Sequence, residues 1–202
     1  MARPAASLWR TVAIWGLLAV VLVVPLVAAA GSPLLAWRDP IYIAASFAGV
    51  LALAVLVCQP LLAGGDLPRL SRPAGRLVHR VLGAAVVGLV LVHLIGLWLT
   101  SPPDVVDALL LRSPTPFSVW GVVAMWAVFA AALMATLRRR LRLHPVTWRR
   151  VHTALAAVIV SATVIHALLI EGTMEPVTKI AVSIAALAGA AMALWRVWRR
   201  VR

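Results

Sequence analysis

Four of the five histidines in the chain form two matched pairs inside apolar segments. His79 and His93 lie 14 residues apart, and His152 and His166 are separated by the same interval. At 100° per residue this interval falls about 40° short of four full helical turns, so both members of a pair lie on one face of a helix. At a rise of 1.5 Å per residue they are about 21 Å apart along the helix axis.

Two such helices that face each other can place imidazoles at two depths of a membrane whose hydrocarbon core is about 30 Å thick. His79 would then meet His152 at one depth, and His93 would meet His166 at the other. Two imidazoles at each depth can ligate two stacked b-type haems, or one haem if only a single pair does so. The chemistry expected of these residues is therefore electron transfer across a membrane.

Two other chemistries compete with haem ligation. A tetrahedral zinc site needs four ligands that converge on one point, whereas these histidines lie on two levels. A proton path in a small transporter is the second alternative, because imidazole titrates near neutral pH and ionisable residues within membranes often form proton relays. We expect haem, because paired imidazoles without a carboxylate or thiol nearby suit its iron. A haem absorption spectrum would separate a cytochrome from a transporter.

The composition is that of an integral membrane protein. Hydrophobic residues make up 63% of the 202 residues, and the mean hydropathy is strongly positive. The single cysteine, Cys58, excludes an intramolecular disulfide and a thiolate metal cluster held by one chain. An excess of 19 basic over 6 acidic residues is compatible with nucleic acid binding, but the basic residues cluster at the ends of apolar segments. We therefore expect contact with membrane lipid and none with nucleic acid.

Six apolar segments of about 20 residues are long enough to cross a bilayer. Each should be an α-helix, because backbone polar groups in lipid must be hydrogen-bonded within the segment. The sequence thus predicts an all-α membrane protein, a six-transmembrane-helix bundle that forms one domain over residues 1–202. The expected helices cover residues 8–29, 41–63, 76–100, 117–137, 149–170 and 177–198.

The charges of the connecting segments predict the orientation. Basic residues near the ends of spans mark the cytoplasmic side, and six crossings return the chain to its starting side, so both termini are expected in the cytoplasm. The predicted cytoplasmic side carries Arg3, Arg10, Arg69, Arg72, Arg76, Arg80, Arg138, Arg139, Arg140, Arg142, Arg149, Arg150, Arg196, Arg199, Arg200 and Arg202. The other side carries Arg38, Arg112, Lys179, Asp39, Asp104, Asp107, Glu171 and Glu175.

The first 30 residues allow a second interpretation. Arg3 and Arg10, the following apolar run and the small residues at 28–31 resemble a secretory signal with a cleavage site. The apolar run is about 20 residues long, which exceeds a normal signal core, so we expect a retained helix. Cleavage would leave the topology of the histidines unchanged.

Two arginines and the fifth histidine have less specific patterns. Arg76 and Arg149 each precede a cytoplasmic-level histidine by three residues, which puts them on the same helix face about one turn nearer the cytoplasm. Either guanidinium can bind haem propionates, and anchoring to anionic lipid is the alternative. His144 precedes Pro145 in a basic loop and is expected to be a solvated loop residue.

The part of the chain from Arg76 to Ile170 resembles the ferric reductase-like transmembrane domain. The histidine spacing on the third and fifth spans is its most specific feature. Further similarity lies in the segments Arg76–Gly83, Arg112–Gly121 and Trp148–His152. That domain is shared by ferric reductases, the membrane part of NADPH oxidases, and the haem-binding membrane subunit of the bacterial periplasmic methionine sulfoxide reductase system.

The resemblance implies that the histidines carry haem b and that electrons pass from the cytoplasmic face outward. His79 and His152 would ligate the inner haem iron, and His93 and His166 the outer one. Long members of the family continue into a domain that binds FAD and NAD(P)H. No glycine-rich dinucleotide fingerprint follows a strand in this sequence, so we expect a separate flavoprotein or quinol as the electron donor.

The sequence therefore predicts a multi-pass dihaem cytochrome b of a bacterial inner membrane. It would be an oxidoreductase component without its own NAD(P)H- or FAD-binding domain, and its electrons would pass to a redox partner on the outer, periplasmic side. One alternative is a quinone-reactive cytochrome b subunit of a dehydrogenase complex. The other is a non-redox membrane transporter or scaffold.

Overall fold

The computed structural model describes residues 7–199, so Arg3, Arg200 and Arg202 of the predicted cytoplasmic side lie outside the described residues. Within that range the regular structure is helical, and six helices are long and apolar enough to cross a membrane. These helices are α1 (Leu8–Ala30), α2 (Pro40–Gly64), α3 (Arg72–Thr100), α5 (Ser118–Leu137), α6 (Pro145–Leu169) and α7 (Pro176–Arg199). The predicted all-α bundle with six membrane-spanning helices is confirmed.

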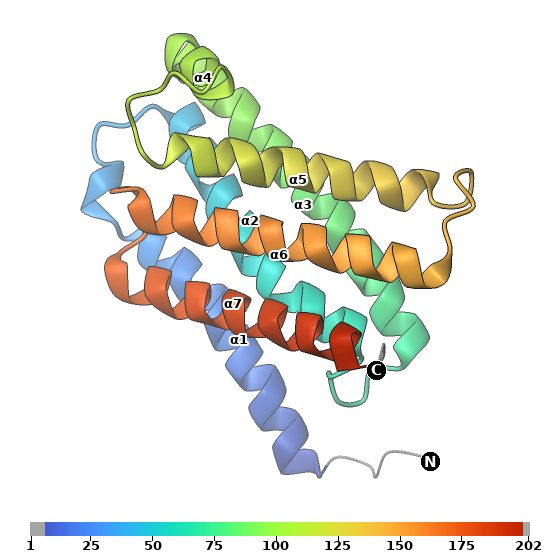
Figure 1. The fold of residues 1–202 in the computed structure, drawn as a ribbon. Coiled ribbons are helices and arrows are strands. Elements are labelled where there is room, and N and C mark those ends of the chain that lie inside the picture. The colour runs from blue at the N-terminus through green and yellow to red at the C-terminus, as the bar shows by residue number, and fades with distance from the viewer. Residues whose placement is uncertain (1–6, 200–202) are drawn as a thin grey trace.

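Two short helices lie in the connections. The 3-10 helix η1 (Pro33–Leu35) joins α1 to α2, and α4 (Pro102–Leu109) covers the ends of α3 and α5 (Figure 1). Helix α4 was not among the helices expected from the sequence. Its two leading prolines stop α3, yet proline is also favoured in the first turn of a helix, where its missing N–H would have no partner. Asp104 in that first turn adds a favourable charge.

The two helices that carry the histidines begin four residues earlier than the sequence predicts. α3 starts at Arg72 and α6 at Pro145. Ser71 caps α3, because its Oγ accepts a hydrogen bond from a backbone N–H of the first turn. His144 caps α6 in the same way through its Nδ1 atom and is exposed. The fifth histidine thus has a structural role at a helix terminus.

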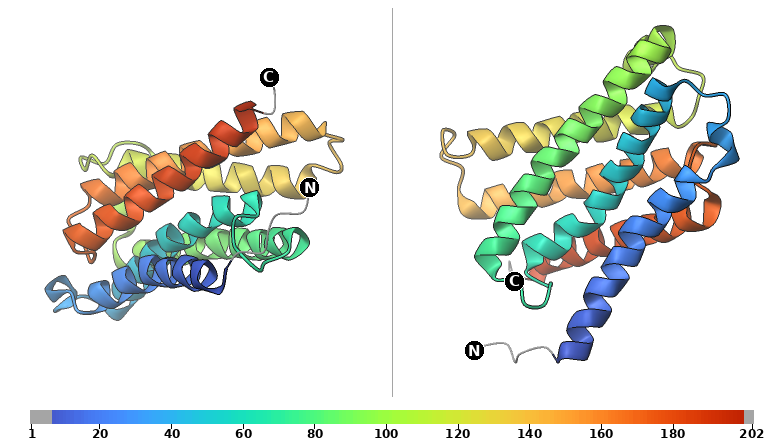
Figure 2. Two further views of the ribbon diagram at one scale, coloured as in Figure 1. Left: turned by 90° about the horizontal axis from the view of Figure 1, so that it is seen from below. Right: turned by 180° about the vertical axis from the view of Figure 1, so that it is seen from behind.

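The six long helices form two layers of three, which Figure 2 shows from below and from behind. In one layer α2 packs between α1 and α3, and in the other α6 packs between α5 and α7. Contacts of α7 with α1 and α2, and of α5 with α3, join the layers. The core between them is apolar and includes the buried residues Leu53 and Val57 of α2 and Val182 and Ala186 of α7.

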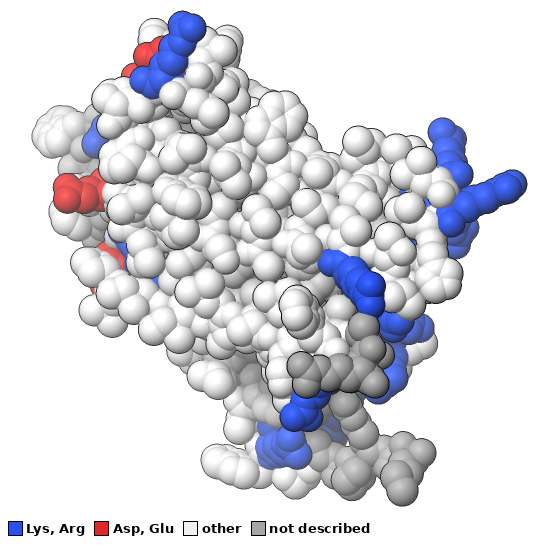
Figure 3. Space-filling model, in the orientation of Figure 1, with Lys and Arg blue, Asp and Glu red and all other residues white. Residues whose placement is uncertain are grey.

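The charged side chains lie at the two ends of the bundle. Figure 3 shows Lys and Arg gathered at one end and most Asp and Glu at the other. The arginine end comprises the start of α1, the α2–α3 and α5–α6 loops and the end of α7, and the acidic end comprises the opposite termini and loops. Exposed tryptophans include Trp9 and Trp198 at the first end and Trp37 at the second, the levels of the aromatic belts of membrane proteins, and also Trp126 midway along α5.

One ion pair joins α7 to the α2–α3 loop at the arginine end. Arg196 near the end of α7 binds Asp66 in the α2–α3 loop, with 2.5 Å between Nη1 and Oδ2. On the same pair of helices, a Cβ on Gly189 of α7 would lie 2.6 Å from Cγ of Pro60 in α2. The absence of a side chain at Gly189 therefore permits the close packing of α7 on α2.

Candidate functional site

The four intramembrane histidines meet as two pairs. The ring centres of His79 and His152 are 6.1 Å apart with an interplanar angle of 81°. Those of His93 and His166 are 6.5 Å apart at 83°. The first pair lies nearer the arginine end and the second nearer the acidic end. Both helices run from the arginine end to the acidic end, and 14 residues separate the two histidines on each of them. The structure thus brings together the partners that the sequence predicts, at two depths.

The helices that carry these rings do not pack closely on each other. α3 packs on α2, α4 and α5, whereas α6 packs on α2, α5 and α7. The histidines therefore face one another across an interior space whose other walls are α2 and α5.

A cavity of about 500 Å³ lies at the level of the second pair, and both His93 and His166 line it. This volume is within the usual range of small-molecule and cofactor sites. The deeper walls are apolar side chains of α2, α3 and α5, namely Leu53, Leu56, Val86, Val90, Met125 and Val128. The surroundings of these two imidazoles are therefore predominantly apolar.

Backbone carbonyls of the neighbouring helices orient the rings of the second pair. His93 Nδ1 lies 2.8 Å from the carbonyl oxygen of Ala45 in α2, and His166 Nδ1 lies 2.8 Å from that of Phe117 at the start of α5. A carbonyl oxygen only accepts, so each Nδ1 carries a proton and donates it. Each Nε2 therefore keeps a free lone pair, the arrangement found in metal-ligating histidines whose second nitrogen is hydrogen-bonded.

A glycine makes room for each of these rings. A Cβ on Gly49 would lie 3.1 Å from Nδ1 of His93, and a Cβ on Gly121 would lie 2.7 Å from Cε1 of His166. Each glycine comes one helical turn after the residue whose carbonyl accepts the histidine bond. Without a side chain at the glycine, the ring can approach the helix closely enough to reach that carbonyl.

The carbonyls and glycines that position the two rings were not predicted from the sequence, although the sequence contains a signal for them. The motif Ser-x-x-Gly occurs at Ser46–Gly49 and again 72 residues later at Ser118–Gly121. The histidine pair of α6 follows that of α3 by 73 residues. The α2–α3 and α5–α6 hairpins are therefore two copies of one arrangement, in which the first helix supports the histidine of the second.

The first pair is held differently. His79 Nδ1 donates to the carbonyl oxygen of Gln59, 3.2 Å away. His152 Nδ1 is buried and has no hydrogen-bond partner among the described residues. Its ring is stacked on Trp148, with 4.8 Å between centres and an interplanar angle of 21°. The guanidinium of Arg138 lies 5.3 Å from the centre of a Trp148 ring, so the stack continues to the surface of the arginine end.

The ring-centre separations of both pairs are close to the spacing that two imidazoles bound to one metal ion would have. A bond of about 2 Å to each imidazole nitrogen, with about 1 Å from nitrogen to ring centre, separates the two ring centres by about 6 Å. No group of three or more His, Cys, Asp or Glu side chains that could hold a metal ion occurs among residues 7–199.

The basic residues of the site lie at two places. Arg76 and Arg149 are exposed at the arginine end, and neither lines the cavity described above. Their assignment to propionates stays a prediction. Lys179 entered the sequence analysis only as a marker of topology, but it is 8% exposed and lines the cavity of His93 and His166.

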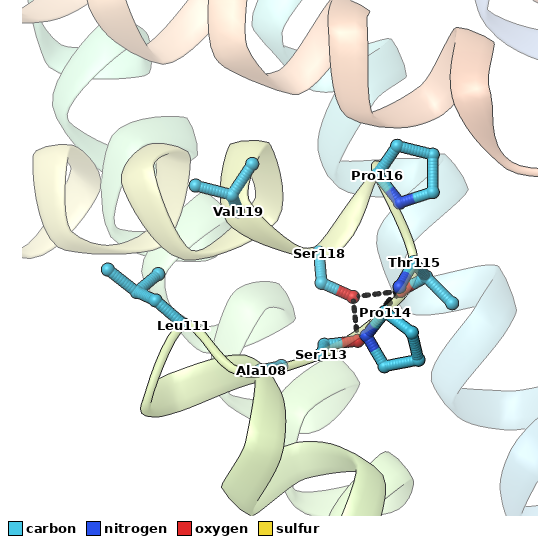
Figure 4. A pocket seen from close by; sticks show the side chains of 8 residues that line it. All are labelled: Ala108, Leu111, Ser113, Pro114, Thr115, Pro116, Ser118 and Val119. Carbon is cyan, nitrogen blue, oxygen red and sulfur yellow. Dashed lines mark hydrogen bonds between the residues drawn. The ribbon is translucent and has the colours of Figure 1, made fainter.

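Three hydroxyl groups close the acidic end of that cavity. Ser113 Oγ lies 2.9 Å from Thr115 Oγ1 and 3.0 Å from Ser118 Oγ, and the latter two also bond to each other (Figure 4). The same residues line a second, smaller pocket of about 160 Å³ in the α4–α5 loop. The three hydrogen-bonded hydroxyl groups hold the start of α5 in place. The carbonyl oxygen of Phe117, which accepts the hydrogen bond from His166 Nδ1, lies at this helix start.

Comparison with known families gives one match. Residues 48–163 match the family described as ferric reductase like transmembrane component. The matched segment contains His79, His93 and His152, and His166 lies three residues beyond its end. No curated protein and no solved structure matches the chain.

Proposed function

Because the chain belongs to the ferric reductase-like transmembrane component family, we propose that it is a dihaem b-type transmembrane electron-transfer protein. In this proposal His79 and His152 hold one haem iron, and His93 and His166 hold the other. The family membership supports a membrane component for electron transfer, and haem is the cofactor typical of such domains.

The observation that carries the proposal is the repeated perpendicular imidazole pair. With ring centres 6.1 and 6.5 Å apart, each pair could hold one haem iron between its two imidazoles. Three of the four Nδ1 atoms are engaged by backbone carbonyls, which leaves Nε2 free on those rings. Haem b bound in this way supplies reversible one-electron oxidation and reduction.

The chain's own residues bind, orient and shield the two centres. Two histidines would hold each haem, and a haem held in this way would serve electron transfer in preference to oxygen chemistry. The carbonyls of Ala45 and Phe117 fix the ring orientation at the acidic end, and hydrogen bonds of this kind raise ligand basicity. Trp148 performs the orienting role for His152. Arg76 and Arg149 are proposed to bind propionates at the arginine end.

The proposal includes a direction of electron flow across the membrane. The positive-inside rule makes the arginine end cytoplasmic, so electrons would enter there from a separate flavoprotein or from quinol. They would leave at the acidic end to an acceptor on the outer, periplasmic side of a bacterial inner membrane. The basic surface of the α5–α6 loop fits an acidic protein donor.

Haem stoichiometry tests the function. The purified protein should bind two six-coordinate, low-spin haems b per chain. His93→Ala or His166→Ala should remove one haem and spare the other, and His79→Ala or His152→Ala should do the reverse. His144→Ala is the matched control, because this exposed residue caps α6 outside both pairs, and it should retain both haems.

Other outcomes decide against parts of the proposal. A ratio of one haem per chain that only one histidine pair controls would replace the dihaem assignment with a one-haem cytochrome. A colourless protein that takes up no haem on reconstitution would overturn the electron-transfer function and favour the transporter alternative.

A further inference from the structure

Lys179 is a buried cation beside the cavity at the acidic end. The residue is 8% exposed and lies in the first turn of α7. Its Nζ donates a 2.7 Å hydrogen bond to the carbonyl oxygen of Ile170. Ile170 follows His166 by four residues, about 6 Å along the helix direction. The ammonium group is therefore anchored within about one turn of a proposed haem ligand.

No carboxylate among residues 7–199 forms an ion pair with this ammonium group, although the charge of Glu175, four residues earlier, is close enough to interact with it electrostatically. The one ion pair found between residues 7 and 199 joins Arg196 to Asp66 at the opposite end of the bundle. The nearest acid on the same segment is Glu175, whose carboxylate accepts hydrogen bonds from the backbone N–H groups of Val177 and Thr178. A cation in the first turn of a helix is also disfavoured by the helix dipole.

A buried ammonium group carries three donors, and burial of a charge costs free energy unless the charge is paired. One donor of Lys179 is used by Ile170. The cavity that Lys179 lines is the direction in which an anion could approach the others. The arrangement therefore points to an anionic group inside the cavity.

Five hydroxyl groups that line the same cavity are engaged in hydrogen bonds with other groups. Thr100 Oγ1 donates to the carbonyl oxygen of Gly96 at 3.0 Å, and Ser101 Oγ donates to Asp104. The hydroxyls of Ser113, Thr115 and Ser118 form the closed triangle of Figure 4. Asp104 itself is exposed, so water screens its charge. Lys179 is thus the cation of the cavity wall with donors to spare.

We propose that Lys179 binds a carboxylate of the haem held between His93 and His166. Haem b carries two propionates, and an ammonium–carboxylate hydrogen bond is among the stronger polar contacts in proteins. The inference rests on the proposed function, because it requires haem at this level. It assigns to α7, which carries no haem ligand, the electrostatic part of cofactor binding.

Haem release tests the inference. Wild-type protein, Lys179→Met and Lys179→Arg are loaded with haem b, and transfer of haem to excess apomyoglobin is followed. Loss of one charge-assisted hydrogen bond should speed release from the acidic-end site by about ten-fold or more in Lys179→Met. Lys179→Arg should stay near wild type. Arg112→Met is the matched control, since Arg112 is an exposed cation at the same end, and its release rate should be unchanged.

A second arm uses haem b dimethyl ester, which lacks ionised carboxylates. Wild-type protein should release the ester about as fast as Lys179→Met releases haem b, and Lys179→Met should cause no further acceleration with the ester. This arm distinguishes a haem carboxylate from a free anion bound in the same cavity. Its wild-type comparison also tests the inference if Lys179→Met fails to fold.

Two results would overturn the inference while leaving the proposed function intact. The first is equal release of haem b by wild type and Lys179→Met. The second is an effect of Lys179→Met that persists with the ester, since Lys179 would then act on something other than a propionate. Wild-type protein that binds no haem at the His93 level would overturn the proposed function at this site, and the inference with it.

Discussion

The ring of His166 lies against the backbone of Gly121 so closely that any side chain there would collide with it. A Cβ on Gly121 would fall 2.7 Å from Cε1 of His166, whereas a Cβ on Gly49 would fall 3.1 Å from Nδ1 of His93. The first contact is far inside van der Waals distance, and the second needs a shift of a few tenths of an ångström. The glycine opposite His166 is therefore the more restrictive of the two.

Gly121→Ala should consequently displace His166 and weaken haem binding at the acidic-end level. Gly49→Ala should have the same effect to a smaller degree. Gly88→Ala is the control, because nothing lies within 4 Å of a Cβ at this position of α3, and alanine there should be neutral or stabilising by up to about 1 kcal/mol. Haem content and the low-spin spectrum measure the effect. Equal behaviour of all three variants would contradict the supporting role of the glycines.

Acid should weaken the start of α7 through Glu175. The hydrogen bonds of its carboxylate with Thr178, and then with Val177, lower the pKa of Glu175 below its ordinary value of 4.5. A lowered folded-state pKa stabilises the fold fully above the unfolded pKa, and this contribution is lost as pH falls through the folded pKa. Glu175→Gln should therefore melt below wild type at about pH 7, and the difference should shrink towards about pH 3.

Thermal unfolding of the detergent-solubilised protein at several pH values measures this effect. Glu171→Gln is the control, because Glu171 is an exposed acid outside the α7 cap, and it should show little change. A difference between Glu175→Gln and wild type that is independent of pH would show that the charge of Glu175 is not responsible.

Reporter fusions should place the arginine end in the cytoplasm. A fusion after Arg142, in the α5–α6 loop, should be active only as a cytoplasmic reporter. A fusion between Pro102 and Ser113, in the connection that contains α4, should be active only on the outer side. The reverse pattern would invert the proposed direction of electron flow, because that direction follows from the arginine distribution.

Donor docking at the α5–α6 loop should depend on salt. Arg139, Arg140 and Arg142 are exposed there, and the Debye length falls from about 30 Å at 0.01 M to about 3 Å at 1 M ionic strength. Reduction of the haems by an acidic flavoprotein should slow over this range, and replacement of the three arginines by glutamine should slow it at low salt. Arg112→Gln at the acidic end is the control. Reduction by quinol at a rate independent of salt and of these arginines would argue for a quinol donor.

The sequence by itself determined the six spans and the pairing of the histidines. Both depend on local regularity: an apolar run must be about 20 residues long to cross a bilayer, and a 14-residue interval keeps two side chains on one helix face. His79 therefore had to lie at the level of His152, and His93 at the level of His166, once the two helices ran in the same direction. The apolar runs did not determine the helix ends, since α3 and α6 extend to capping residues outside those runs.

Only the tertiary structure decided what surrounds the histidines. The carbonyls that fix His93 and His166, the stacking of Trp148 on His152 and the burial of Lys179 all depend on how each helix is rotated and how closely it approaches its neighbours. A single sequence gives the face of a helix but not the residue opposite it. For this reason the spacing of Arg76 to His79 predicted a propionate partner, whereas the charge distribution gave Lys179 only as a marker of topology. The packing of α7 against α6 places Lys179 in the wall of the cavity.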